Sequence, residues 1–165
     1  MDKFEILKQK IVSKTEAQKL VEQWRLKSDK IVFTNGCFDI LHYGHIDYLA
    51  KTASFGNRLI VGLNADESVK KLGKGNTRPI QNETSRATIL AALGFVDAVV
   101  VFAEETPLEL IRIIKPDVLV KGGDWKIETI VGSDFVRSYH GEVTTIPFVE
   151  GFSTTLIEQK IKSTN

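Results

Sequence analysis

Cysteine is nearly absent from this sequence, with Cys37 the single example among 165 residues. One cysteine cannot form an intrachain disulfide, and it cannot supply the thiolate set of a structural zinc site. Such a composition is typical of a reducing compartment. A chain of this length buries a substantial core without cross-links, so we expect a cytoplasmic globular protein.

Long apolar runs and an excess of one charge are also missing. No stretch approaches the roughly 20 apolar residues that cross a bilayer, and residues 1–5 are charged, unlike a signal peptide. Lys and Arg number 22 and Asp and Glu 21, a net charge of +1, whereas proteins that bind nucleic acid usually carry a basic excess. We therefore expect no membrane and no nucleic-acid partner, and any anion site must be local.

Short apolar runs alternate with helical stretches along the chain. The runs lie at 31–33, 59–61, 98–101, 118–120 and 143–146, and the helical stretches at 45–55, 83–93, 106–114, 133–139 and 154–162. Continuous apolar strands separated by helices are typical of a parallel sheet covered on both faces. The sequence predicts an α/β fold, namely a Rossmann-like, doubly wound, five-stranded parallel sheet with helices on both faces.

Residues 1–28 form a predicted N-terminal helical extension ahead of the main domain, 29–165. Thr15 is the expected cap of its second helix, and the extension covers a sheet edge or forms a dimer contact. Further on, Thr106-Pro107-Leu108-Glu109 predicts a helix capped by Thr106 with a capping box. The long irregular segment 72–81 is a candidate functional loop.

Residues 34–45 follow the first strand, where open parallel sheets bind their ligands. A glycine, Gly36, lets backbone N–H groups approach a phosphate. His42 and His45 share one face of a helical turn, at a helix N-terminus that favours anions. Gly44 leaves room between them, so the segment predicts a phosphate site.

The pattern alone leaves other interpretations of this segment open. The glycine turn also suits an ordinary strand-to-helix connection. The two histidines could be structural or surface groups, or they could bind zinc with Cys37 or Asp39 as a third ligand.

Three later segments suit a nucleotide and an anionic acceptor. Residues 151–155, GFSTT, open the last helix with hydroxyl groups and free N–H groups, although a simple helix cap has the same residues. Residues 121–124, KGGD, follow a strand and allow close approach to a base or ribose. The basic residues of 70–79, with Arg86 beyond, suit a phosphorylated substrate or a merely solvated loop.

Residues 34–45, TNGCFDILHYGH, resemble the signature of the cytidylyltransferase-like branch of the HxGH nucleotidyltransferase superfamily. The resemblance implies a nucleotidyltransferase domain over 29–165, in which His42 and His45 stabilise the transition state on the triphosphate. It implies Mg²⁺ held mainly by the triphosphate, with no metal ligand from protein side chains. The implied nucleotide-binding residues are Thr34, Asn35, Gly36, Cys37, Phe38, Asp39, Gly44, Lys121, Gly123, Asp124, Ser153, Thr154 and Thr155. The implied substrate-phosphate residues are Lys71, Lys74, Arg78 and Arg86.

Within the superfamily the chain is most similar to the adenylyltransferases of ADP-heptose synthesis. The likeness covers about residues 28–162 and rests on segments 34–39, 78–80 with Arg86, 115–124, 130–132 and 151–155. It implies transfer of AMP from ATP to D-glycero-β-D-manno-heptose 1-phosphate, giving ADP-heptose and pyrophosphate. It also implies a form without the sugar kinase to which this domain is often fused, and a homodimer is among the arrangements it allows.

The alternatives belong to other substrate and function classes. One is a cytidylyltransferase acting on glycerol 3-phosphate or another small phosphate. Another is a non-catalytic nucleotide-binding module on the same fold, because a fold does not fix a function. A third is a zinc-dependent hydrolase.

Overall fold

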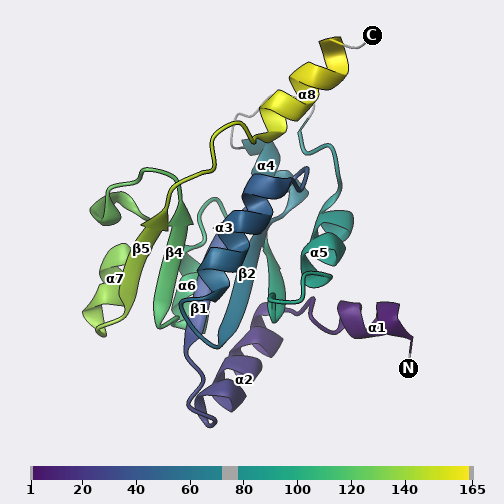
Figure 1. The fold of residues 1–165 in the computed structure, drawn as a ribbon. Helices are drawn as coiled ribbons and strands as arrows, with labels where there is room; N and C mark the ends of the chain where they lie inside the picture. Colours follow the sequence, from purple (N-terminus) through teal and green to yellow (C-terminus); the bar gives the residue numbers. More distant parts are fainter. Residues whose placement is uncertain (1, 72–77, 164–165) are drawn as a thin grey trace.

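A single parallel sheet organises the molecule. The computed structural model describes residues 2–71 and 78–163. Its strands are hydrogen-bonded in the order β3-β2-β1-β4-β5 (Figure 1). They are β1 Ile31–Gly36, β2 Arg58–Asn64, β3 Ala98–Phe102, β4 Val118–Gly122 and β5 Glu142–Ile146. The predicted five-stranded, doubly wound parallel sheet is confirmed.

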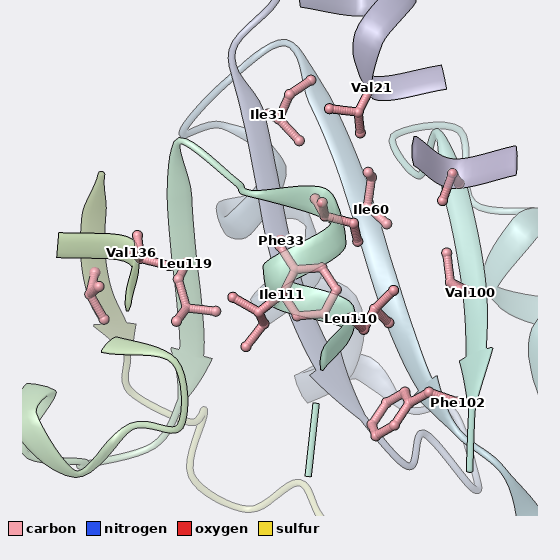
Figure 2. Close-up of a cluster of buried hydrophobic side chains, with 14 of the residues drawn as sticks. Val21, Ile31, Phe33, Ile60, Val100, Phe102, Leu110, Ile111, Leu119 and Val136 are labelled. Atoms are coloured by element: carbon pink, nitrogen blue, oxygen red, sulfur yellow. The ribbon is translucent and has the colours of Figure 1, made fainter. Parts of the chain in front are cut away.

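Helices cover both faces of this sheet, as predicted. They are α1 Lys3–Lys8, α2 Lys14–Arg25, α3 Tyr43–Ala53, α4 Asp66–Lys71, α5 Glu83–Ala91, α6 Leu108–Ile114, α7 Ser133–Ser138 and α8 Thr154–Ser163, with the 3₁₀ helix η1 at Ile127–Thr129. Alternate strand residues point to opposite faces. Phe33 therefore belongs to a core cluster with residues of α2, α6 and α7, and in Figure 2 it lies beside Leu110 and Ile111 of α6. Val32 belongs to the cluster on the other face, with residues of α3 and α5.

The strand order reverses beside β1. The chain passes from β1 to β2 and β3 on one side and then returns to β4 and β5 on the other. Register pairs Val32 with Val118 and Phe33 with Leu119, so the carboxyl ends of β1 and β4 lie next to each other. Crevices at such a switch point are where open α/β sheets bind ligands.

Two local predictions were wrong, and one short helix was not predicted. Ser13 caps α2 in place of Thr15, because Glu16 completes a reciprocal capping box with Ser13. Helix α6 begins at Leu108 with Pro107 in the cap position and no side-chain cap bond, so Thr106 forms no capping box. Helix α4 was not predicted, because a helix of six mostly charged residues is too short to show an apolar period.

The N-terminal extension packs onto the domain. Ala17 and Val21 of α2 are buried in the core. The segment before α2 forms a parallel bridge between Ile11 and Val99 of β3, so it covers that edge of the sheet. Among the described residues, no helix is long and apolar enough to cross a membrane.

Candidate active site

His42 and His45 lie where β1 leads into α3. His42 is the N-cap residue, with extended backbone at φ −141° and ψ 172°, and the amide of His45 donates to the His42 carbonyl at 2.9 Å. The two imidazole rings stack with centroids 3.8 Å apart and 23° between their planes. This places both rings on one face of the helix N-terminus, where free N–H groups and the dipole favour an anion.

The imidazole of His42 is partly withdrawn from water. Its Nδ1 atom is buried and meets no hydrogen-bond partner in the part of the chain that the structure describes. Burial lowers the pKa of His42 from its ordinary 6.5. The ring is therefore neutral at pH 7, with one nitrogen as a donor and the other as an acceptor. A bound phosphate oxygen would satisfy the donor and favour the protonated ring.

Gly44 allows this stack to form. A Cβ atom at Gly44 would lie 3.2 Å from Nδ1 and Cε1 of His42 and 3.2 Å from Cβ of Phe152. These contacts are tighter than ordinary packing, so a larger residue would push against the His42 ring or the turn before α8. The glycine thus brings the HxGH turn and the 151–155 turn together.

A cavity of ≈ 620 Å³ opens beside His45 at the carboxyl ends of β1 and β4. A smaller cavity of ≈ 160 Å³ adjoins it next to His42 and shares His45, Phe148 and Thr154 with it. The larger one has the volume of a typical small-molecule site. Its lining consists of Asn35, Gly36, Cys37, Phe38, Asp39, His45, Tyr48, Val69, Arg78, Lys121, Gly122, Trp125, Phe148, Thr154 and Thr155.

Most of the residues implied by the resemblance meet at these two cavities. Segment 35–39, His45, Lys121 and the hydroxyl pair 154–155 line the larger one. His42, Gly44 and Ser153 line the smaller one. Lys121 Nζ lies 3.4 Å from Asn35 Oδ1, which links β4 to β1 across the switch point.

Thr34 lies below the site. It is fully buried, and its hydroxyl is 2.6 Å from the hydroxyl of Tyr48. Burial raises the pKa of Tyr48 to about 12, so this pair stays neutral and fixes α3 on β1. Thr34, which the resemblance implied as a nucleotide contact, lines neither cavity.

The 121–124 turn contributes different residues from those expected. Gly123, with φ of +102°, and the exposed Asp124 are not among the residues that line either cavity. Gly122 and Trp125 line it instead, and Trp125 Nε1 donates to the Gly122 carbonyl at 3.0 Å.

The Asp39 carboxylate faces segment 78–81. Its carboxylate accepts from the amides of Ile80 and Gln81 at 2.9 Å and from Arg78 Nη1 at 3.1 Å. Burial would raise the pKa of Asp39, but the amides of Gln81 and Ile80 and the Arg78 guanidinium outweigh it and lower the pKa. Asp39 therefore anchors segment 78–81 to the HxGH turn, and it also lines the larger cavity.

Arg86, which the resemblance implied as a ligand of the substrate phosphate, lines neither cavity. Its side chain is 0% exposed, and it forms an ion pair with Asp66 at 2.6 Å. Its other donors reach the carbonyls of Cys37 at 2.7 Å and Gln81 at 2.9 Å. This buried guanidinium ties three segments together beneath the cavity, and removing its partners would leave an uncompensated buried charge.

The remaining basic candidates fall in different places. Arg78 lines the larger cavity. Lys71 ends α4, is exposed and is not part of either lining. Lys74 lies outside the described residues.

Two exposed aromatic side chains at the cavity, Trp125 and Phe148, were not among the predicted site residues. Trp125 and Phe148 are 52% and 64% exposed and lie at its mouth, with buried Tyr48 behind them. A Cβ atom at Gly122 would lie 2.6 Å from the Phe148 ring, so the absence of a side chain at Gly122 leaves room for that ring. The glycine pair was a usable signal for Trp125, whereas Phe148 follows no recognisable pattern.

A zinc site finds no support in this geometry. Within residues 2–71 and 78–163, no three His, Cys, Asp or Glu side chains gather closely enough to hold a metal ion. Asp39, one proposed third ligand, is engaged by the loop and Arg78. Mg²⁺ prefers oxygen ligands and usually keeps several waters, so a triphosphate would supply the donor set that these side chains do not.

Comparisons with known proteins agree with this architecture. A family model described as cytidylyltransferase-like matches residues 33–165. The bifunctional protein HldE of Campylobacter jejuni subsp. doylei is 57% identical over 153 residues, 93% of this chain and 32% of that protein. HldE of Koribacter versatilis is 53% identical over 151 residues, 92% of this chain and 31% of that protein. The chain therefore spans about a third of the length of these relatives.

A solved structure with a similar fold is the lipopolysaccharide core biosynthesis protein of Thermoplasma volcanium. It aligns with a TM-score of 0.59 and 27% identity, covering 73% of this chain and 97% of that one.

Proposed function

The chain belongs to the cytidylyltransferase-like family of nucleotidyltransferases, and from this premise we propose that it transfers AMP from ATP to D-glycero-β-D-manno-heptose 1-phosphate. The products are ADP-heptose and pyrophosphate. The identity of 53–57% to bifunctional HldE proteins supports this substrate. The observation that carries the reaction type is the stacked His42–His45 pair at the N-terminus of α3, beside a cavity at the switch point.

The reaction is an in-line displacement at the α-phosphorus of ATP. A phosphate oxygen of the sugar phosphate forms the new P–O bond, and the bond to pyrophosphate breaks. The acceptor is already an anion at pH 7, so no general base is needed. What the protein must supply is alignment and donors for the charge that develops on the phosphates.

His42, His45 and the 153–155 turn supply those donors. The imidazole N–H groups and the free amides at the start of α3 face the triphosphate, and the hydroxyls of Thr154 and Thr155 face it from α8. Lys121 adds a cation at the end of β4. Mg²⁺ would be held mainly by the triphosphate, and it would supply positive charge to the phosphate oxygens.

The aromatic mouth of the cavity suits the base. Trp125 and Phe148 present exposed rings above the Gly122 turn, and a purine offers a larger flat surface for stacking on them than a pyrimidine does. This favours ATP over CTP. Since ATP and sugar phosphates are cytoplasmic metabolites, the proposal places the reaction in the cytoplasm.

A substrate panel read by pyrophosphate release tests this proposal. ATP and CTP are each paired with heptose 1-phosphate and with glycerol 3-phosphate, and the ATP and heptose 1-phosphate pair is expected to give the highest kcat/KM. Turnover only with CTP and glycerol 3-phosphate would select the cytidylyltransferase alternative. Tight ATP binding without any pyrophosphate would select a non-catalytic module.

Histidine variants test the reaction centre separately. His42→Ala and His45→Ala are each expected to lower kcat by on the order of 10²-fold with an unchanged circular dichroism spectrum, the usual loss for a transition-state donor. His140→Asn, an exposed site at φ 67° where Asn is tolerated, serves as the control. Near-normal turnover by both alanine variants would remove the catalytic assignment.

A further inference from the structure

Arg78 is held between two carboxylates from different parts of the chain. Its Nη1 lies 3.1 Å from Asp39 Oδ2, and its Nη2 lies 2.7 Å from Glu158 Oε2. Asp39 belongs to the HxGH turn and Glu158 to α8. The Arg78 side chain is 13% exposed, and the residue lines the larger cavity, so this triad borders the place where an anionic acceptor has to bind.

The charge of the triad is wrong for an anion site as it stands. One guanidinium carries +1 and the two carboxylates carry −2, so the group has a net charge of −1. A phosphate that approached Arg78 with both carboxylates in place would meet like charge at short range and little free donor capacity. One carboxylate must leave before Arg78 can hold a phosphate.

Glu158 is the carboxylate that can leave. The Asp39 side chain is 5% exposed and is also fixed by the amides of Ile80 and Gln81. The Glu158 side chain is 24% exposed and belongs to α8, which buries none of its residues. In Figure 1, α8 extends away from the sheet at the top of the view. Glu158 can therefore turn into solvent without breaking other contacts of its carboxylate among the described residues, whereas Asp39 would have to give up the amides of Ile80 and Gln81.

We propose that Glu158 is an internal counterion that the acceptor phosphate displaces from Arg78, and that Glu158 thereby sets the affinity for the acceptor. The inference rests on the proposed function for the identity of the acceptor. Glu158 is a positioning residue, since it acts through Arg78.

The expected phenotype is a gain in affinity. Glu158→Gln removes the competing charge and keeps the shape, so the KM for heptose 1-phosphate is expected to fall about fivefold, the scale of a partly exposed ion pair, with kcat within about twofold. Glu158→Asp keeps the charge and is expected to keep a KM near that of the wild type. Glu109→Gln, which removes an Arg-paired carboxylate from the remote helix α6, controls for the change in net charge.

A second measurement separates this inference from the proposed function. Binding of inorganic phosphate to the protein is measured by calorimetry for the wild type, Glu158→Gln, Arg78→Met and the double variant. Tighter phosphate binding in Glu158→Gln, lost when Arg78 is Met, supports the counterion role even if heptose 1-phosphate proves not to be the substrate. An unchanged or raised KM with unchanged phosphate binding would overturn it, as would an equal gain in the Arg78→Met background.

Discussion

Gly44 offers a test that separates the catalytic geometry from the stability of the fold. Gly44→Ala adds one methyl group in the first turn of α3, where the backbone is helical. Alanine is the better helix former by up to about 1 kcal/mol. The new Cβ atom would lie 3.2 Å from the His42 ring and 3.2 Å from Phe152 Cβ, and both distances are shorter than the 3.4–4 Å of ordinary contact. One of these groups must move by a few tenths of an ångström.

The two effects act on different measurements. The propensity gain offsets the crowding, so the midpoint of thermal unfolding is expected to stay within a few degrees of the wild type. The His42 ring is stacked 3.8 Å from the His45 ring. We expect the new methyl group to push the His42 ring out of the position in which it donates to the triphosphate. Misplacement of this kind costs on the order of 10- to 100-fold in rate, and we expect that loss in kcat measured by pyrophosphate release.

The control for this experiment is Gly94→Ala, because nothing lies within 4 Å of a Cβ atom there. That variant is expected to keep both its activity and its unfolding midpoint. Full activity in Gly44→Ala would refute the argument that the close approach of the two turns positions His42. A large fall in the unfolding midpoint that parallels the loss of activity would also refute it, since the glycine would then be structural only.

Three further outcomes follow from the site. The pKa of His42 is lowered in the folded protein, so folding opposes its protonation, and stability is lost as pH falls below about 6.5. Urea unfolding at pH 7.5 and 5.5 should show a smaller loss of unfolding free energy for His42→Gln than for the wild type. Asp39→Asn should lower the free energy of unfolding by about 2–4 kcal/mol, whereas Asp47→Asn, which breaks an exposed-lysine pair, should cost under about 1 kcal/mol. In a Trp24→Phe variant, ATP should quench the fluorescence of Trp125, and an unchanged spectrum would place the base elsewhere.

The sheet and the switch point were predictable because both depend on local signals. Five runs of β-branched and aliphatic residues became the five strands, since parallel strands covered on both faces are rich in such residues. Residues that follow a strand directly, such as Asn35 and Lys121, came to the site because carboxyl ends of parallel strands meet at one edge. Sequence position alone therefore located much of the cavity.

The partners of the charged residues could not be predicted in this way. Arg86 was expected to bind an anion because it lies one to two helical turns beyond the basic segment 70–79. Asp66, 20 positions earlier in the chain, forms an ion pair with it in the interior instead. Asp39 likewise serves segment 78–81, about 40 residues further on. Such pairings depend on how helices settle onto the sheet, and a buried charge reports its role only once its partner is known.

The bridge between Ile11 and Val99 bears on edge-to-edge association of the sheet with other chains. Strand β3, with the sequence AVVVF, would be a flat apolar edge open to pairing with another chain. The N-terminal segment occupies that edge: the Val12 amide donates to the Val99 carbonyl at 3.0 Å, and the Val99 amide donates to the Lys10 carbonyl at 2.8 Å. The Lys10 ammonium donates to the Val96 carbonyl at 2.8 Å and so adds a charge beside the edge. The N-terminal segment thus occupies backbone groups of β3 through which the sheet could otherwise pair with a second chain.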